Sequence, residues 1–374
     1  MTKDFFPVFI GLVLLACKPS VSDRTNNEYQ LSEIQLDYAR AFSLEKSAEG
    51  LYLIRTFHPS NPGDVLQEFT INHSSDDSIL ADFNGLPSKV AILSTTYLSF
   101  LSTLDVTESI CCLSNGDLIY SQEIVDRLEK GLIKDLGHDQ NFDFETLIDQ
   151  QPDLIFFYDF SPNTAAFASR LEKTGIPVVR VGEYLETHPL GQSEWLKFFA
   201  VFFNKLTSAE HIFEDVKSAY EEISNNVQDN KSFEVLTDLP WKGEWHQAGG
   251  RSFQAQYIKD AGGAYIWKND TSVAGTLMDR EIIIEKALEA DIWLNPGSAN
   301  SIQEMIAIDP RFLEFKSVKN GDVYNNNNRL SERGGNDYWE SGIMNPHIIL
   351  KDLATIFQPG SFSENNLVYY QKLE

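Results

Sequence analysis

The residues best suited to bind a ligand are aromatic, arginine and polar side chains in segments that follow predicted strands. Tyrosine and tryptophan offer flat apolar platforms with a polar tip, and arginine can pair with a carboxylate through two hydrogen bonds. Ligands of open α/β sheets bind beyond the carboxyl ends of the strands, so this set predicts a site for a large planar or chelated ligand. The predicted ligand-binding residues are Thr96, Tyr120, Tyr158, Trp241, Trp245, Arg251, Arg333, Asn336, Tyr338 and Trp339.

A purely structural role is the alternative for each aromatic residue of this set, because large rings also pack the interfaces between lobes. The run Gly334-Gly335-Asn336-Asp337-Tyr338-Trp339 favours function more strongly. Two glycines beside polar and aromatic residues contribute little to stability. Arg251 and Arg333 favour an anionic ligand, although an aromatic site also suits a neutral corrinoid.

Motifs that would indicate catalysis do not occur in the sequence. It contains no Walker-type phosphate loop, no G-x-S-x-G nucleophile elbow and no H-E-x-x-H zinc motif. The segment Gly249-Gly250-Arg251-Ser252 is rich in glycine but lacks the G-x-G-x-x-G spacing. The seven histidines form no local pair at metal-ligand spacing. We therefore expect a binding protein that is not an enzyme and has no cofactor.

Composition and the N-terminus indicate where the protein works. The formal net charge of −25 argues against nucleic acid, whose phosphates need a basic surface. Phe5 to Ala16 is a short apolar run, and Leu14-Leu15-Ala16-Cys17 resembles a bacterial lipobox. That resemblance implies a signal peptide over residues 1–16, a lipid on Cys17, and a place on the periplasmic or cell-surface face of a bacterial membrane. An ordinary signal peptide with an incidental cysteine is the alternative.

The elements that must position the ligand residues are organised around one helical stretch, Gln192 to Val227. Its apolar residues recur at steps of three and four, as on one face of a helix. The pattern Thr207-Ser208-Ala209-Glu210 is a capping box and predicts two helices that break near Lys205–Ser208. The first helix has apolar residues on several faces, so we expect it to be buried on several sides.

Strands and helices alternate on both sides of this helical stretch, which predicts parallel sheets covered by helices. The expected fold is α/β, with two Rossmann-like lobes joined by a long rigid helix and a β-rich N-terminal extension. The expected domains are the signal peptide (1–16), a tether and β-rich extension (17–84), an N-terminal lobe (85–190), the connecting helices (191–230) and a C-terminal lobe (231–374).

The order of these features resembles a known family. The pieces are Lys89 to Thr96, Asn141 to Asp153, Pro177 to Val179, the connecting helices, Gly249 to Phe253, Asp260 to Gly263, Glu281 to Asp291 and the run Gly334 to Glu340. Over roughly residues 85 to 358 the chain resembles the class III periplasmic substrate-binding proteins, which serve ABC importers of iron complexes and cobalamin. It is most similar to the lipoprotein members that carry such a Gly-Gly-Asn-Asp-Tyr-Trp-Glu run.

The resemblance implies a function and a partner. A lipid-anchored receptor would hold an iron chelate (siderophore or haem) or cobalamin between its lobes and deliver it to an ABC permease. Glu145 and Glu281 occupy the motif positions of the glutamates that dock onto the permease, although a carboxylate in a first helical turn is also favoured by the helix dipole. The alternatives are a receptor for free Zn²⁺ or Mn²⁺, with His138, His188 and His246 as candidate ligands, and an enzyme on a related two-lobed frame.

Overall fold

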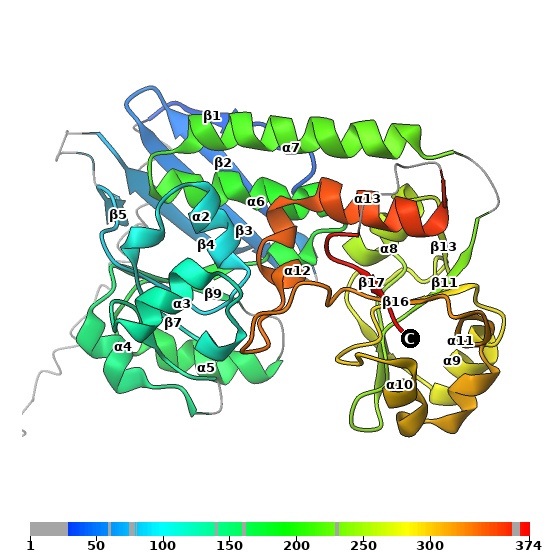
Figure 1. Ribbon diagram of the computed structural model, residues 1–374. Coiled ribbons are helices and arrows are strands. Elements are labelled where there is room, and N and C mark those ends of the chain that lie inside the picture. Colours follow the sequence, from blue (N-terminus) through cyan, green and yellow to red (C-terminus); the bar gives the residue numbers. More distant parts are fainter. Residues whose placement is uncertain are drawn as a thin grey trace, which may run out of the picture.

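The computed structural model describes residues 29–58, 61–74, 79, 81–138, 141–158, 162–228, 232–360 and 367–374. The predicted signal peptide and Cys17 lie outside these residues. Two lobes lie side by side beneath a pair of helices that connects them (Figure 1). This arrangement confirms the α/β fold expected from the sequence; the exact domain boundaries stay a prediction.

The N-terminal lobe is built on a five-stranded parallel sheet with strand order β10-β9-β6-β7-β8. Its strands are short apolar runs, as expected of strands that helices cover on both faces. The strands are β6 (Val90–Ile92), β7 (Ile110–Leu113), β8 (Lys134–Asp135), β9 (Leu154–Tyr158) and β10 (Val178–Val181). The helices between them are α2 (Tyr97–Thr103), α3 (Gln122–Glu129), α4 (Phe144–Gln150) and α5 (Pro162–Glu172).

The C-terminal lobe contains a second sheet, of order β13-β11-β15-β16-β17, in which the last strand is antiparallel to its neighbour. Its strands are β11 (Glu234–Thr237), β13 (Ala264–Tyr265), β15 (Ile292–Leu294), β16 (Val323–Asn325) and β17 (Gln371–Lys372). A separate two-stranded antiparallel sheet pairs β12 (Trp245–Gln247) with β14 (Thr276–Met278). The helices are α8 (Phe253–Asp260), α9 (Arg280–Ala287), α10 (Ile302–Ile308), α11 (Lys316–Asn320), α12 (Asp337–Glu340) and α13 (Pro346–Phe357).

The connecting helices are α6 (Pro189–Phe202) and α7 (Leu206–Asn226), which we call the strut. The predicted break is present, but the capping box is not its cause. Thr207 lies within the first turn of α7, and Lys205 occupies the N-cap without a side-chain hydrogen bond. The end of α6 sets the break instead, because Asn204 adopts a left-handed conformation and the Lys205 N–H donates to the Ala200 carbonyl at 2.9 Å.

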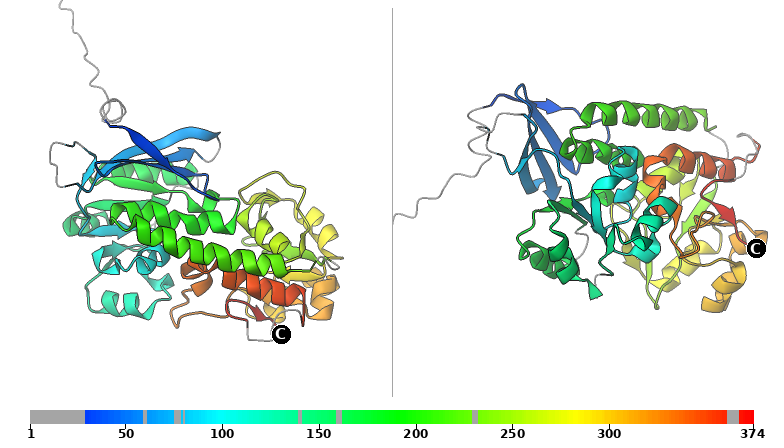
Figure 2. Two further views of the ribbon diagram at one scale, coloured as in Figure 1. Left: turned by 90° about the horizontal axis from the view of Figure 1, so that it is seen from above. Right: turned by 60° about the vertical axis from the view of Figure 1, so that its left-hand side comes forward.

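The N-terminal extension forms a five-stranded sheet of β1 (Leu31–Ile34), β2 (Phe42–Ser47), β3 (Leu51–His58), β4 (Asn61–Asn72) and β5 (Phe83–Asn84). It lies against α6 (Figure 2), with the Phe42 and Trp195 ring centroids 4.6 Å apart and those of Phe69 and Phe202 5.7 Å apart. Together with α7, α2 and α8, which also pack on α6, this sheet buries every residue of the helix except Gln192.

Two buried glutamates tie the chain before β2 to the strut. The Glu194 carboxylate accepts hydrogen bonds from the backbone N–H groups of residues 37, 38 and 39 at 2.8 to 2.9 Å. The Glu186 carboxylate accepts those of residues 40 and 41, and also the Trp195 indole N–H at 2.9 Å. These hydrogen bonds therefore attach the extension to the strut.

Candidate functional site

The carboxyl ends of the parallel strands turn sharply in both lobes. Asn115 follows β7, Asp238 follows β11 and Asn295 follows β15, and all three have positive φ angles between 55° and 63°. Asparagine and aspartate tolerate this conformation better than other residues with side chains. Tyr120 follows the first of these turns, and Trp241, Trp245 and Arg251 follow the second.

Residues 329–340, which we call the tongue, reach from the end of β16 in the C-terminal lobe to the N-terminal lobe (Figure 1). The Glu340 carboxylate accepts hydrogen bonds from the Tyr120 N–H at 2.7 Å and the Ser121 N–H at 2.9 Å. The Ser331 hydroxyl donates to the Ile119 carbonyl at 3.1 Å. The segment after β7 in one lobe thus meets the segment after β16 in the other.

The structure explains why both Gly334 and Gly335 of the tongue are glycines. A Cβ atom on Gly335 would lie 2.4 Å from the Ile119 carbonyl oxygen and 2.6 Å from that of Leu118, so any side chain would push the lobes apart. Gly334 has a φ of +97°, which side-chain-bearing residues rarely adopt. The sequence attributed these glycines to a binding loop, whereas the structure gives them a role in joining the lobes.

Charged groups surround the contact between tongue and lobe. The Arg333 guanidinium lies 2.8 Å from the Glu129 carboxylate across the two lobes. Arg329 pairs with Asp337 at 2.6 Å, and its guanidinium lies 5.3 Å from the centre of the Tyr120 ring. Burial raises the pKa of Glu340 to about 7, against the opposing effect of the two backbone N–H groups.

Four predicted ligand residues are exposed: Trp339, Trp241, Arg251 and Arg333. Trp339 is 44% exposed on the tongue, and Trp241 is 70% exposed in the turn after β11. Arg251 is exposed just before α8. The Lys242 ammonium lies 3.9 Å from the centre of the Trp241 ring, so a cation already covers one face of that ring.

Trp245 and Tyr338 lie in the protein interior, which corrects the expectation that they face a ligand. Trp245 is 1% exposed, with its ring centroid 6.1 Å from that of Trp293 and 5.7 Å from that of Phe312. Tyr338 is buried beside Tyr370, at 5.9 Å between centroids. The pairing of β12 with β14 draws Trp245 inward, because it places this ring over the core of the C-terminal lobe.

The remaining predicted residues are partly engaged by protein groups. Thr96 precedes α2 and shares a hydrogen bond with the Ser94 hydroxyl. Asn336 caps α12 by accepting the Tyr338 N–H at 3.0 Å. Tyr120 and Tyr158 are half-buried at or after the carboxyl ends of β7 and β9. The structure therefore brings Tyr120, Arg333 and Asn336 together at the tongue.

Sequence reasoning missed three buried acids near the strand ends. Glu183 follows β10, and burial raises its pKa to about 7. Within the described residues, one carboxylate oxygen of Glu183 and the hydroxyl of buried Tyr97 have no hydrogen-bond partner. Burial likewise raises the pKa of Asp238 to about 6, and Glu340 is the third. Each follows or faces a strand end, but no sequence pattern reveals that it is buried.

The three candidate metal-ligating histidines have separate surroundings. His138 lies beside Asn115 and Asp117, His188 caps α6, and His246 lies beside Glu244 on β12. Among the residues described by the structure, no group of three His, Cys, Asp or Glu side chains is placed to hold a metal ion.

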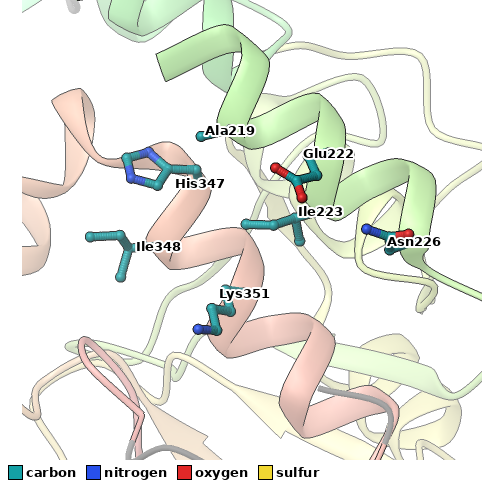
Figure 3. Close-up of a pocket in the computed structure, with 7 residues that line it drawn as sticks. All are labelled: Ala219, Glu222, Ile223, Asn226, His347, Ile348 and Lys351. Atoms are coloured by element: carbon teal, nitrogen blue, oxygen red, sulfur yellow. The ribbon is translucent and has the colours of Figure 1, made fainter. Parts of the chain in front are cut away.

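A pocket of about 400 Å³ lies between α7 and α13, on the strut (Figure 3). The side chains around it come from both helices: Ala219, Glu222, Ile223, Asn226, His347, Ile348 and Lys351. No predicted ligand residue lines this pocket, so we place the candidate site at the strand ends and the tongue.

Comparison with known proteins agrees with this geometry. Residues 90–330 match the model of a family described as periplasmic binding protein. The chain belongs to this family. Periplasmic binding proteins are substrate-binding proteins of transport systems, so the expectation that the chain is not an enzyme is confirmed by its family.

The chain is also similar to other sequences, and it shares its fold with solved structures. Two uncharacterized lipoproteins of Methanocaldococcus jannaschii are 27% and 25% identical to this chain, over 76% and 68% of its length and 68% and 65% of theirs. A periplasmic haem-binding protein from Pseudomonas aeruginosa has a TM-score of 0.58 at 13% identity, covering 77% of this chain and 99% of that one. A possible iron-binding protein from Staphylococcus epidermidis has a TM-score of 0.56 at 20% identity, covering 73% and 99%.

In the part of the chain that the structure describes, no helix is both long enough and apolar enough to cross a membrane.

Proposed function

We propose that this periplasmic binding protein is a lipoprotein, anchored through Cys17, that captures a metal chelate between its lobes and delivers it to an ABC permease. The chelate is an iron siderophore, haem or cobalamin. The observation that carries the proposal is the meeting of the two lobes at Tyr120 and Glu340, which brings the segment after β7 into contact with the segment after β16. Ligands of open α/β sheets bind beyond the carboxyl ends of the strands.

The accessible side chains suit a large planar ligand. Trp339 and Trp241 offer aromatic faces, and Arg251 and Arg333 offer guanidinium groups for carboxylates. Solved structures of the same fold include proteins named for iron binding, for haem binding and for ferric-hydroxamate transport. These names support a metal chelate as the ligand class.

The proposed contact with the permease involves Glu145 and Glu281. Both carboxylates are exposed in the first turns of α4 and α9. An exposed isoleucine accompanies each one, Ile148 on α4 and Ile282 on α9. A charged group beside exposed apolar surface is typical of a docking face.

Tryptophan fluorescence of a soluble form that lacks residues 1–17 tests the ligand class. Ferric siderophores, haem and cobalamin are titrated side by side, with Zn²⁺ and Mn²⁺ as controls. We expect saturable quenching by one chelate, and weaker binding by Trp339→Ala than by the control Leu288→Ala at the far end of α9. A response to a bare metal ion alone would replace the proposal with a free-metal receptor, and unchanged affinity in Trp339→Ala would remove the tongue from the site.

A further inference from the structure

The two proposed docking glutamates differ in how their own lobes hold them. Glu145 is exposed, and within the described residues it forms no ion pair. Glu281 is also exposed, at 73%, but its two carboxylate oxygens accept hydrogen bonds from Arg311 Nη1 at 2.8 and 3.0 Å. One lobe thus presents a free negative charge, and the other presents a neutral pair.

Arg311 is held in this position by a group other than Glu281. Asp309, only 7% exposed, accepts from Arg311 Nε at 3.1 Å, from Nη2 at 2.8 Å and from the Arg311 backbone N–H at 3.0 Å. Arg280 donates to the same carboxylate at 2.7 Å. Arg311, followed by Arg280, lowers the pKa of Asp309 to about 2, so this carboxylate stays ionised. Asp309 therefore holds the Arg311 guanidinium in the position in which it contacts Glu281.

The ion pair between Arg311 and Glu281 has little value for stability. Arg311 is 47% exposed, and ion pairs between exposed side chains contribute only about 0–1 kcal/mol. Its effect on a partner is larger, because a basic residue that approaches Glu281 also meets the positive charge of Arg311. Like charges brought together at an interface oppose association. Glu145 imposes no such repulsion.

We propose that Arg311 makes the two docking contacts unequal. Glu145 provides the charge contact with a basic residue of the permease, while Arg311 restrains Glu281. The C-terminal lobe then docks mainly through the exposed apolar side chains beside Glu281, which are Ile282 and Leu277. This inference rests on the proposed function, because it assumes that the permease is the partner.

The affinity of the mature, lipid-free protein for its partner tests this inference. The probe is an iron-complex-type ABC permease from the same organism, reconstituted in lipid nanodiscs. We expect Glu145→Gln to weaken binding by about 10-fold or more, and Glu281→Gln to change it less than about 2-fold. Arg311→Gln should tighten binding by about 2- to 5-fold, and Glu281→Gln added to it should abolish that gain.

Lys316→Gln is the matched control. Lys316 pairs with Asp291 at 2.7 Å, and its backbone N–H contacts Leu288 at the far end of α9, so this variant loses the same charge from the same lobe elsewhere. A gain equal in Lys316→Gln and Arg311→Gln, or no gain in Arg311→Gln, would overturn the inference while leaving the docking role intact. A wild-type protein that does not bind the permease would overturn the proposed function and the inference together.

Discussion

The lobes are joined at two places that differ in chemistry, the strut and the tongue. The strut consists of α6 and α7. Phe199 of the buried helix α6 has its ring centroid 4.7 Å from those of Phe100 and Phe156 in the N-terminal lobe, and α7 packs against α13 of the C-terminal lobe. The tongue meets the opposite lobe through hydrogen bonds from two backbone N–H groups and one hydroxyl, and through one exposed ion pair. The strut therefore fixes the lobes together, and the tongue is the contact that small movements of the lobes can break.

The largest expected effect is on the strut. Phe199→Ala removes a fully buried ring and leaves a cavity among aromatic neighbours, so we expect a loss of about 3–5 kcal/mol in the free energy of unfolding. Urea denaturation checks this value. A loss below about 1 kcal/mol would mean that the strut is not the rigid connection described above.

The next largest effect is expected for the tongue. Glu340→Ala leaves the N–H groups of Tyr120 and Ser121 without their acceptor, at a cost of about 1–3 kcal/mol. Faster hydrogen exchange at these two amides should accompany the loss. Glu332→Ala, at an exposed tongue position, is the control and should leave both amides protected. Equal exchange in the two variants would exclude Glu340 as the joining group.

The pH dependence of stability tests the contribution of Glu340 in the tongue. The pKa of Glu340 is about 7 in the folded protein and near 4.5 when unperturbed, so the folded state binds more protons between these values. Its contribution is fully present below about pH 4.5 and is lost as pH rises through 7. The stability of wild type relative to Glu340→Gln should therefore fall across this window. Glu183 has a similarly raised pKa and is present in both proteins, so its contribution cancels in the difference between their stabilities.

The smallest effect is expected for the exposed ion pair between Arg333 of the tongue and Glu129. Arg333→Ala breaks an ion pair in which both side chains are exposed, and it should change the free energy of unfolding by less than about 1 kcal/mol. Denaturation at low and high salt checks this, because salt screens an exposed pair and should leave no difference between variant and wild type. A loss as large as that of Glu340→Ala would show that the ion pair, rather than the buried carboxylate, joins the lobes.

The fold was predictable from local patterns, but which of the predicted ligand residues are buried was not. Buried strands such as Leu154–Tyr158 are apolar runs, and α13 begins at Pro346 as its sequence predicts. Trp241 and Trp245 lie four residues apart in one segment, yet one is exposed and the other is in the core. That difference arises from the pairing of β12 with β14, which joins residues about thirty positions apart.

The role of the tongue shows the same limit. Its composition marks it as unusual, but Glu340 contacts Tyr120 across 220 positions of sequence. No local pattern reports a contact of that range, so a segment that joins the lobes resembles a binding loop when only its sequence is known. Tyr338 is part of the tongue, and its burial beside Tyr370 is likewise not visible in the local sequence.

Hydrogen exchange of the mature protein, with and without the chelate that quenches its fluorescence, tests the central claim most directly. We predict slower exchange after binding in both lobes, at the strand ends after β7 and β11 and in the tongue, with α6 unchanged. Protection confined to one lobe, or to the pocket between α7 and α13, would contradict a site between the lobes.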